Sequence, residues 1–412
     1  MIKVAIMGYG TIGSGVNEVL ETNRKILAEK IGQELEVKYI LDLRDFPGTS
    51  VEGKIVHDFS VICRDEEVKI VVETMGGLEP AYTFVKSCLE AGKHVATSNK
   101  ALVAAYGTEL LAIAREKKVN FLFEASVGGG IPIIRPLYRC LMGEKIQEIT
   151  GILNGTTNFI LTKMDKEGTS FDRALKEAQA LGYAERNPEA DVEGHDTCRK
   201  IAILTAMVTG REVDYEEIST EGITGITDVD FRYADAMGTS IKLVGSSRME
   251  SGRVHAWVAP LMIGRDHPLY GVSDVNNGII VKGNMVGTTM YYGSGAGKLP
   301  TASAVVADMA EAARHLDSNI PIGWSGEKQV IAPADEEVCR FFVRVSGSFE
   351  DRRDMVEAAF GKCRVIDLGQ GLDEFAFLTG PMKRSRFAEN LEILKVELTA
   401  EYQNVLQIIR AE

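Results

Sequence analysis

The feature that most constrains the fold is a glycine-rich turn near the start of the chain, Gly8-Tyr9-Gly10-Thr11-Ile12-Gly13. Residues 3–7 before it form an apolar run typical of a strand, and a helical pattern begins at its end. A tight turn requires the first glycine, close approach of a pyrophosphate requires the second, and close packing of helix on strand requires the third. The alternative is a strand–helix turn that binds nothing. The position between strand and helix favours a dinucleotide site made by Gly8, Gly10, Thr11, Ile12 and Gly13.

Short apolar runs alternate with helical patterns through residues 1–125. The runs lie at 3–7, 37–41, 70–72, 95–97 and 120–123, and the helical patterns at 13–30, 80–91 and 106–117. Alternation of this kind predicts an α/β protein with a Rossmann-type parallel sheet covered on both faces.

The pattern of residue types changes after this first domain. Residues 126–300 carry glycine-rich turns, charged clusters and longer helices, which predicts a second, α+β domain. An amphipathic helix is expected at 301–316, and a linker containing proline and glycine at 317–336. The tail, residues 337–412, has a βαββαβ order of patterns, which predicts a small domain of its own.

Composition excludes several classes of partner. The 412 residues carry a formal net charge of -13, and 45% of them are apolar. An acidic surface repels phosphate backbones and anionic lipid heads, so neither nucleic acid nor a membrane surface is an expected partner. No apolar run approaches the roughly 20 residues that span a bilayer. With no leader-like start and six scattered cysteines, we expect a cytoplasmic protein with reduced thiols and no zinc site.

Charged residues after the second strand bear on the choice of cofactor. Asp42 would bind the adenosine ribose hydroxyls and favour NAD, whereas Arg44 would accept the 2′-phosphate of NADP. Each is also compatible with an ordinary solvent-facing loop charge.

Two later strand ends should also touch the cofactor, because ligands of open α/β sheets lie outside the carboxyl ends of the strands. The expected contacts are Thr74, Gly76, Thr97, Ser98 and Lys100. Lys100 would place a cation near the nicotinamide ring, although a solvent-facing lysine at a helix start would look the same.

The segment 181–200 carries five carboxylates before a helix expected at 196–209. Asp196 and Lys200 are four apart and therefore share a face, which continues into an apolar stripe. A partly buried lysine suits a general acid/base, whereas a plain helix-stabilising pair would explain the spacing alone. Glu185, Asp191 and Asp196 together would hold a substrate ammonium, which a helix start does not require.

Two further clusters precede this segment. Residues 151–158 lead an apolar run into a Gly155-Thr156-Thr157 turn, whose N–H groups and hydroxyls suit either a carboxylate ligand or simple helix capping. Residues 124–132 contain three consecutive glycines that would let carbonyls converge on a monovalent cation. A tight interdomain crossover is the alternative.

Together these motifs resemble homoserine dehydrogenase over residues 1 to about 320, including Tyr292-Gly293-Ser294-Gly295-Ala296-Gly297 before Pro300. The resemblance implies reversible NAD- or NADP-dependent interconversion of L-homoserine and aspartate 4-semialdehyde, in the pathway to threonine, methionine and isoleucine. It implies that residues 126–300 catalyse and dimerise, and that helix 301–316 completes the Rossmann domain.

The family's roles carry over to matching positions. Lys200 resembles the acid/base lysine, Lys100 the second active-site lysine, and Glu185 the principal homoserine-binding acid, aided by Asp191 and Asp196. Further substrate contacts would be Gly155, Thr156 and Tyr183, and Gly297 would be a late cofactor contact. Carbonyls at Glu124, Val127, Gly129 and Ile131 resemble the family's sodium or potassium site.

The tail resembles an ACT regulatory domain in element order only, because residues 346–352 lack the proline usual before the first helix of such domains. Two other functions stay open. A phosphorylating semialdehyde dehydrogenase would need a thiolate, for which Cys198 and Cys140 are candidates. A nucleotide- or amino-acid-sensing protein would bind the cofactor without turnover and would leave Lys200 unexplained.

Overall fold

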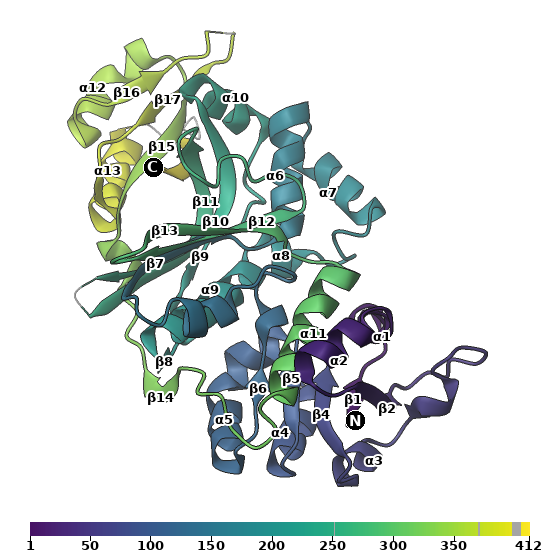
Figure 1. Cartoon of the computed structure of the whole chain (residues 1–412). Helices are drawn as coiled ribbons and strands as arrows, with labels where there is room; N and C mark the ends of the chain where they lie inside the picture. Colours follow the sequence, from purple (N-terminus) through teal and green to yellow (C-terminus); the bar gives the residue numbers. More distant parts are fainter. Residues whose placement is uncertain (251, 370, 398–404) are drawn as a thin grey trace. The chain divides into compact units, whose positions relative to one another are not determined.

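The structure is a computed structural model that describes residues 1–250, 252–369, 371–397 and 405–412 (Figure 1). The chain divides into two compact units. Unit 1 comprises residues 1–146, 199–215 and 282–329, and unit 2 comprises residues 147–198, 216–281 and 330–412. No helix in the described part of the chain has the length and apolar character needed to cross a membrane.

Unit 1 contains a parallel six-stranded sheet in the order β3-β2-β1-β4-β5-β6. This is the strand order of dinucleotide-binding sheets, in which successive strands are added on one side of β1 and then, from β4 onward, on the other side. The strands are β1 (Ile2–Met7), β2 (Leu35–Leu41), β3 (Ile55–Val56), β4 (Val68–Glu73), β5 (His94–Thr97) and β6 (Phe121–Leu122). The central strands are apolar because helices bury both faces; Val4, Ile6, Ile70 and Val72 are fully buried. The predicted α/β class with an N-terminal parallel sheet is confirmed.

The helices of unit 1 cover the predicted patterns, but one begins at Lys100 rather than at 106, and the helix at 59–64 was not predicted. They are α1 (Thr11–Thr22), α2 (Arg24–Ile31), α3 (Phe59–Arg64), α4 (Ala81–Glu90), α5 (Lys100–Lys117) and α11 (Lys298–Ala313). The single helix predicted over residues 13–30 is wrong, because the helix breaks at Asn23, which has φ -102° and ψ 15°. Unit 1 also contains β8 (Arg211–Glu212), β13 (Gly287–Ser294) and β14 (Ser325–Lys328).

Unit 2 is built on a mixed sheet in the order β12-β7-β10-β11-β19-β15-β17-β16. Its first strands are β7 (Ile146–Ile152), β9 (Ser219–Thr220), β10 (Thr239–Glu250), β11 (Arg253–Gly264) and β12 (Asn276–Gly283). Its helices are α6 (Gly155–Glu167), α7 (Phe171–Ala180), α8 (Glu189–Val192), α9 (His195–Thr209) and α10 (Asp228–Met237). The longest pairing is the antiparallel β10–β11 ladder, from Thr239 opposite Gly264 to Glu250 opposite Arg253. Helix α9 starts in unit 2 and continues into unit 1.

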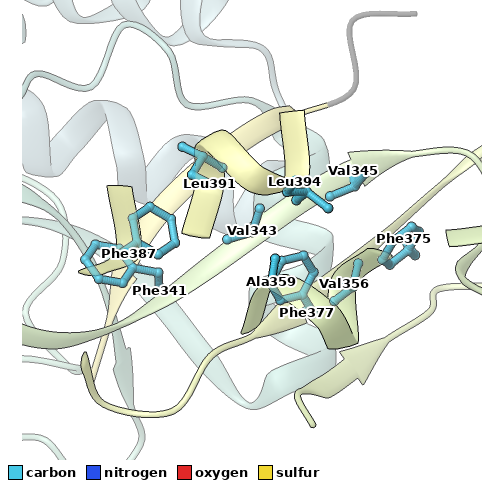
Figure 2. Close-up of a cluster of buried hydrophobic side chains, with 10 residues drawn as sticks. All are labelled: Phe341, Val343, Val345, Val356, Ala359, Phe375, Phe377, Phe387, Leu391 and Leu394. Atoms are coloured by element: carbon cyan, nitrogen blue, oxygen red, sulfur yellow. The ribbon is translucent and has the colours of Figure 1, made fainter. Parts of the chain in front are cut away.

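The tail, residues 337–412, has the βαββαβ order expected from the sequence, with one extra short strand. Its elements are β15 (Val338–Ser346), α12 (Phe349–Phe360), β16 (Arg364–Ile366), β17 (Glu374–Leu378), β18 (Met382–Lys383), α13 (Arg384–Glu397) and β19 (Val405–Ala411). Both helices pack on one face of its strands around a ten-residue apolar core (Figure 2). At one end of this core Phe341 stacks on Phe387, with ring centroids 3.8 Å apart.

The tail is continuous with the rest of unit 2. Its last strand, β19, lies between β11 and β15, with Leu261 opposite Arg410 and Met262 opposite Ala411. A buried ion pair joins Arg344 of β15 to Asp230 of α10 at 2.5 Å. Removing one member of such a pair leaves an uncompensated buried charge, so this contact fixes the tail on α10. The boundaries predicted at 1–125, 126–300, 317–336 and 337–412 remain predictions.

Candidate functional site

The glycine turn leaves room for an anion at the start of α1. Gly8 has φ +91°, and a Cβ on Gly13 would lie 1.9 Å from the Gly8 carbonyl oxygen, so both positions require glycine. A Cβ on Gly10 would meet no atom within 4 Å. Gly10 is the N-cap of α1, and the first turn of α1 contains no acid. The predicted residues Gly8, Gly10, Thr11, Ile12 and Gly13 therefore surround an open helix N-terminus that suits a pyrophosphate.

Asp42 and Arg44 lie beside this turn and bind each other. The Asp42 carboxylate accepts hydrogen bonds from the Tyr9 N–H at 2.8 Å and from Arg44 Nε at 2.9 Å. The Arg44 guanidinium holds the pKa of Asp42 well below its usual range. The carboxylate is nearly buried, whereas 61% of the Arg44 side chain is exposed. The pair thus offers a carboxylate suited to ribose hydroxyls and an exposed cation suited to a 2′-phosphate.

A cleft of about 510 Å³ opens at the carboxyl ends of β1, β2 and β4. Its lining includes Gly8, Gly10, Leu41, Asp42, Leu43, Arg44, His57, Phe59, Thr74, Met75, Pro80 and Phe84. Phe59 and Phe84 stack with centroids 4.0 Å apart and give the cleft an apolar wall. The cleft lies where the strand order reverses, which is where open α/β sheets bind nucleotides. His57, Phe59 and Phe84 were not predicted, because no local motif marks them.

A buried hydrogen-bond network ties together the two later strand ends. Glu73 Oε1 accepts from the N–H groups of Met75 and Gly76 at 2.8 and 3.1 Å, and Glu73 Oε2 accepts from the Thr97 hydroxyl at 2.6 Å. The Asn99 side chain donates to the Gly77 carbonyl at 2.6 Å and accepts from the Leu102 N–H, capping α5. Burial raises the pKa of Glu73, which is 0% exposed.

This network contains the predicted cofactor contacts of the later strands. Gly76 and Thr97 bond to Glu73 directly, and the Ser98 N–H donates to the Glu73 carbonyl at 3.4 Å. The Thr74 hydroxyl donates to the Gly8 carbonyl at 2.8 Å, linking the network to the glycine turn. Lys100 is the first residue of α5, immediately after Asn99. Glu73 was not predicted as a site residue, because a strand-ending acid carries no signature of its own.

Gly297 lies at the start of α11, also in unit 1. It is the N-cap of α11 and has φ +119°. The first turn of α11 packs closely on α1, since a Cβ on Gly15 would lie 3.0 Å from atoms of Lys298 and Ala302. Lys298 also forms an ion pair with Glu18 of α1 at 2.7 Å.

In unit 2, Asn154 gathers two of the predicted substrate acids. Asn154 Nδ2 donates to Asp191 Oδ1 and to Asp196 Oδ2, each at 2.8 Å. Asn154 Oδ1 accepts from the Thr157 N–H at 2.8 Å and so caps α6. The Asn154 amide therefore brings two carboxylates of unit 2 together. The amide's bridging role was not predicted, since residues 154, 191 and 196 are far apart in sequence.

Gly155 and Thr156 lie at the start of α6, and Tyr183 and Glu185 follow α7. The Thr156 hydroxyl donates to the Tyr183 carbonyl at 2.6 Å, and the Tyr183 ring packs edge-on against Phe159. A Cβ on Gly155 would lie 2.7 Å from the Val275 carbonyl oxygen, so only glycine fits there. Glu185 is exposed; within the described residues, the Asn154 hydrogen bonds reach Asp191 and Asp196 but not Glu185.

Lys200 lies one helical turn after Asp196 on α9. Asp196 is 3% exposed and Lys200 is 8% exposed. The same face continues with Ile203, Leu204 and Met207, all buried, as the helical spacing predicts. Lys200 therefore lies on the buried face of α9.

The loop 124–131 in unit 1 is fixed by buried charge. The Glu124 carboxylate accepts hydrogen bonds of 2.6–2.8 Å from the N–H groups of Ile133, Ile134 and Arg135. Asp308 accepts from the Glu124 N–H at 2.8 Å and pairs with Arg135 at 2.5 Å. Because the Glu124 carboxylate is committed to these bonds, a cation in this loop would depend on its backbone carbonyls and the Ser126 hydroxyl. Among the described residues, no group of three His, Cys, Asp or Glu side chains is placed to hold a metal ion.

Two family models match this chain. A family model described as "Homoserine dehydrogenase, NAD binding domain" matches residues 8–124, and one described as "Homoserine dehydrogenase" matches residues 132–310. The chain is 36% identical to a homoserine dehydrogenase of Bacillus subtilis over 418 residues, covering 98% of this chain and 94% of that protein. It is 44% identical over 315 residues to one of Synechocystis, covering 75% of this chain and 72% of the other.

Solved structures show the same likeness. A homoserine dehydrogenase from Thiobacillus denitrificans aligns with a TM-score of 0.88 at 34% identity, covering 100% of this chain and 98% of that one. A hyperthermophilic archaeal homoserine dehydrogenase in complex with NADPH aligns with a TM-score of 0.65 at 30% identity, covering 76% of this chain and 97% of the other.

Proposed function

The chain belongs to the homoserine dehydrogenase family of NAD(P)-dependent oxidoreductases, and from that premise we propose how its residues carry the reaction. The observation that carries the proposal is the bridge from Asn154 to Asp191 and Asp196, one helical turn before Lys200. Asp191 and Asp196, with Glu185, bind the ammonium of homoserine. The rest of the amino acid contacts Gly155 and Thr156, at the start of α6, and Tyr183, whose carbonyl accepts from the Thr156 hydroxyl.

Lys200 moves the proton. In its neutral form it takes the hydroxyl proton of homoserine as hydride leaves C4, and in reverse its ammonium protonates the carbonyl oxygen of aspartate 4-semialdehyde. Its burial and its place one turn after Asp196 support this role. Lys100, at the start of α5, serves as the second active-site lysine, positioned by the Asn99 cap.

Unit 1 binds the dinucleotide, whose nicotinamide supplies the hydride acceptor when bound. The open space at Gly10 and the bare N-terminus of α1 fit the pyrophosphate, and the cleft lined by Phe59 and Phe84 fits the adenosine. The rest of the dinucleotide contacts Thr74, Gly76, Thr97, Ser98 and Gly297. Asp42 supports use of NAD and Arg44 supports use of NADP, so we propose that the chain accepts either cofactor.

We further propose that a monovalent cation, sodium or potassium, binds the carbonyls of Glu124, Val127, Gly129 and Ile131. Support comes from the fixed loop: a Cβ on Gly129 would lie 2.4 Å from the Gly295 carbonyl oxygen, so the loop conformation requires glycine. Turnover compared in potassium, sodium and tetramethylammonium chloride at equal ionic strength tests this site. Equal turnover rates in all three salts would contradict the proposed cation site.

The assembly and location of the protein are part of the proposal. Exposed Met290 and Tyr292, two apart on β13, support association of two copies. The acidic surface and the six free cysteines support a cytoplasmic location. The βαββαβ order of the tail supports an ACT-like domain that serves for association. Light scattering of the full chain and of a Met290→Glu, Tyr292→Glu double variant would measure the contribution of β13.

The decisive experiment follows absorbance of the reduced nicotinamide with L-homoserine and with NAD or NADP in turn. We expect homoserine-dependent reduction of at least one cofactor and its loss in Lys200→Ala. Cofactor binding without turnover in the unaltered protein would overturn the proposed roles.

A further inference from the structure

Two arginines of the tail converge on one carboxylate in the rest of unit 2. Arg384, the first residue of α13, lies 2.8 Å from Glu221 Oε1, and Arg410 of β19 lies 3.3 Å from the same oxygen. Arg410 is 3% exposed, and its guanidinium lies 5.1 Å from the centroid of the Trp257 ring. Through these two arginines, α13 and β19 both contact Glu221, which immediately follows β9.

The backbone beside Glu221 is fixed on both sides. The Glu221 N–H donates to the Val258 carbonyl of β11 at 2.8 Å, and the Ile223 N–H donates to the Val192 carbonyl at 2.8 Å. A Cβ on Gly222 would lie 2.4 Å from the Val192 oxygen and 2.6 Å from Glu193 Cα. Residues 221–223 therefore press directly on the end of α8.

The segment that residues 221–223 contact is the turn that joins the two proposed substrate-binding acids. Asp191 lies in α8, and Asp196 lies in the first turn of α9. Between them, Gly194 has φ +82°, and a Cβ there would lie 3.1 Å from Thr220 and 3.2 Å from Val258. Asn154 bonds the two carboxylates directly, so the acids are held by their side chains and, through residues 192–194, by their backbone.

We infer that Glu221 is a positioning residue for the homoserine site, through which Arg384 and Arg410 of the tail set the spacing of Asp191 and Asp196. The inference rests on the proposed role of these two acids. Because Glu221 is 43% exposed and Arg384 is 30% exposed, their ion pair contributes little to global stability. Its effect is expected in the geometry of the turn, where small displacements change the binding of a charged ammonium.

The test compares steady-state constants of the full chain in Glu221→Gln, Arg384→Met and the double variant. We expect each single change to raise the KM for L-homoserine about 3- to 30-fold while the KM for the dinucleotide and kcat stay close to the parent values. The double variant should be no worse than Glu221→Gln, because both changes remove the same contact. Glu221→Asp, which keeps the carboxylate, should recover part of the lost affinity.

A matched control is Arg253→Met. Arg253 of β11 pairs with Glu336, just before the tail, at 2.7 Å, and both side chains are about as exposed as Glu221. Among the described residues, the side-chain bonds of Arg253 reach Glu336 and not residues 192–194, so the control should leave every KM unchanged. The inference would be overturned if Arg253→Met raised the KM for homoserine as much as Glu221→Gln does. It would also be overturned if the effects of the two single changes on this KM added in the double variant, or if the homoserine KM of Glu221→Gln were unchanged. If the unaltered protein does not turn over homoserine, the proposed function fails instead.

Discussion

The Thr97 hydroxyl donates a 2.6 Å hydrogen bond to Glu73, and both side chains are fully buried at the ends of neighbouring strands β5 and β4. The same carboxylate accepts the N–H groups of Met75 and Gly76. One side chain therefore holds two segments at the carboxyl edge of the sheet in unit 1, where the dinucleotide is proposed to bind.

Glu73→Ala should weaken dinucleotide binding. The substitution removes the acceptor of the Thr97 hydroxyl and of the Met75 and Gly76 N–H groups. Leaving the fully buried Thr97 hydroxyl without its acceptor costs about 1–3 kcal/mol. We expect the dissociation constant of the dinucleotide, measured by fluorescence titration, to rise at least tenfold, corresponding to about 1.4 kcal/mol. Glu73→Gln should recover part of the loss, because its amide oxygen still accepts the two N–H groups. Equal binding by Glu73→Ala and the parent would contradict the positioning role.

Lys200→Ala should lower kcat by about 100- to 10,000-fold, the usual contribution of general acid/base catalysis. Binding of the dinucleotide should change little. Lys200→Arg keeps the positive charge but cannot give up a proton at accessible pH, so it should be nearly as slow. Rapid turnover by Lys200→Arg would show that charge alone is needed.

Asn154→Ser separates the bridge from the helix cap. Serine caps helices about as well as asparagine, so α6 should keep its start. Serine is too short to bond both Asp191 and Asp196, and hydrogen bonds to charged groups contribute about 1.5–3 kcal/mol. The KM for homoserine should rise about tenfold or more at little cost in melting temperature. An unchanged KM would show that the bridge is dispensable.

His57 should make the choice of cofactor depend on pH. Its Nδ1 lies 2.7 Å from the Asp42 carbonyl and its Nε2 lies 3.0 Å from Asp45, and these contacts raise the pKa of His57. The ring is therefore cationic below the raised pKa and loses its charge as pH increases through it. Since His57 lines the proposed adenosine cleft, affinity for NADP relative to NAD should fall as pH increases beyond about 6.5.

Parallel titrations of the two cofactors at each pH provide the measurement. His57→Gln keeps a donor near the Asp42 carbonyl but does not titrate, so the affinity ratio should become nearly independent of pH. A ratio in His57→Gln that falls as steeply as in the parent would assign the titration to another group.

The sequence was most informative where the signal was local. The turn at Gly8–Gly13 and the alternation of apolar runs correctly predicted the parallel sheet, and the motif order predicted the family, which the relatives confirm. The break at Asn23 was missed because the helical pattern continues through it. The contacts made by Glu73 and Asn154 could not be predicted, since they join residues brought together only by folding.

For the loop at Glu124, the sequence drew attention to backbone carbonyls, whereas the structure shows the side chain bonding three successive N–H groups. A strand at Val405–Arg410 was predicted from its apolar pattern, but its place between β11 and β15 was not, because a pattern does not specify which strands pair.

The place of β19 has a consequence for how this chain can be handled. Deleting residues 405–412 would expose two rows of unpaired backbone groups at once, one on β11 and one on β15. Open strand edges recruit other chains, so such a truncated protein should aggregate rather than persist as a smaller monomer. The final strand of the chain therefore protects unit 2 from unwanted self-association.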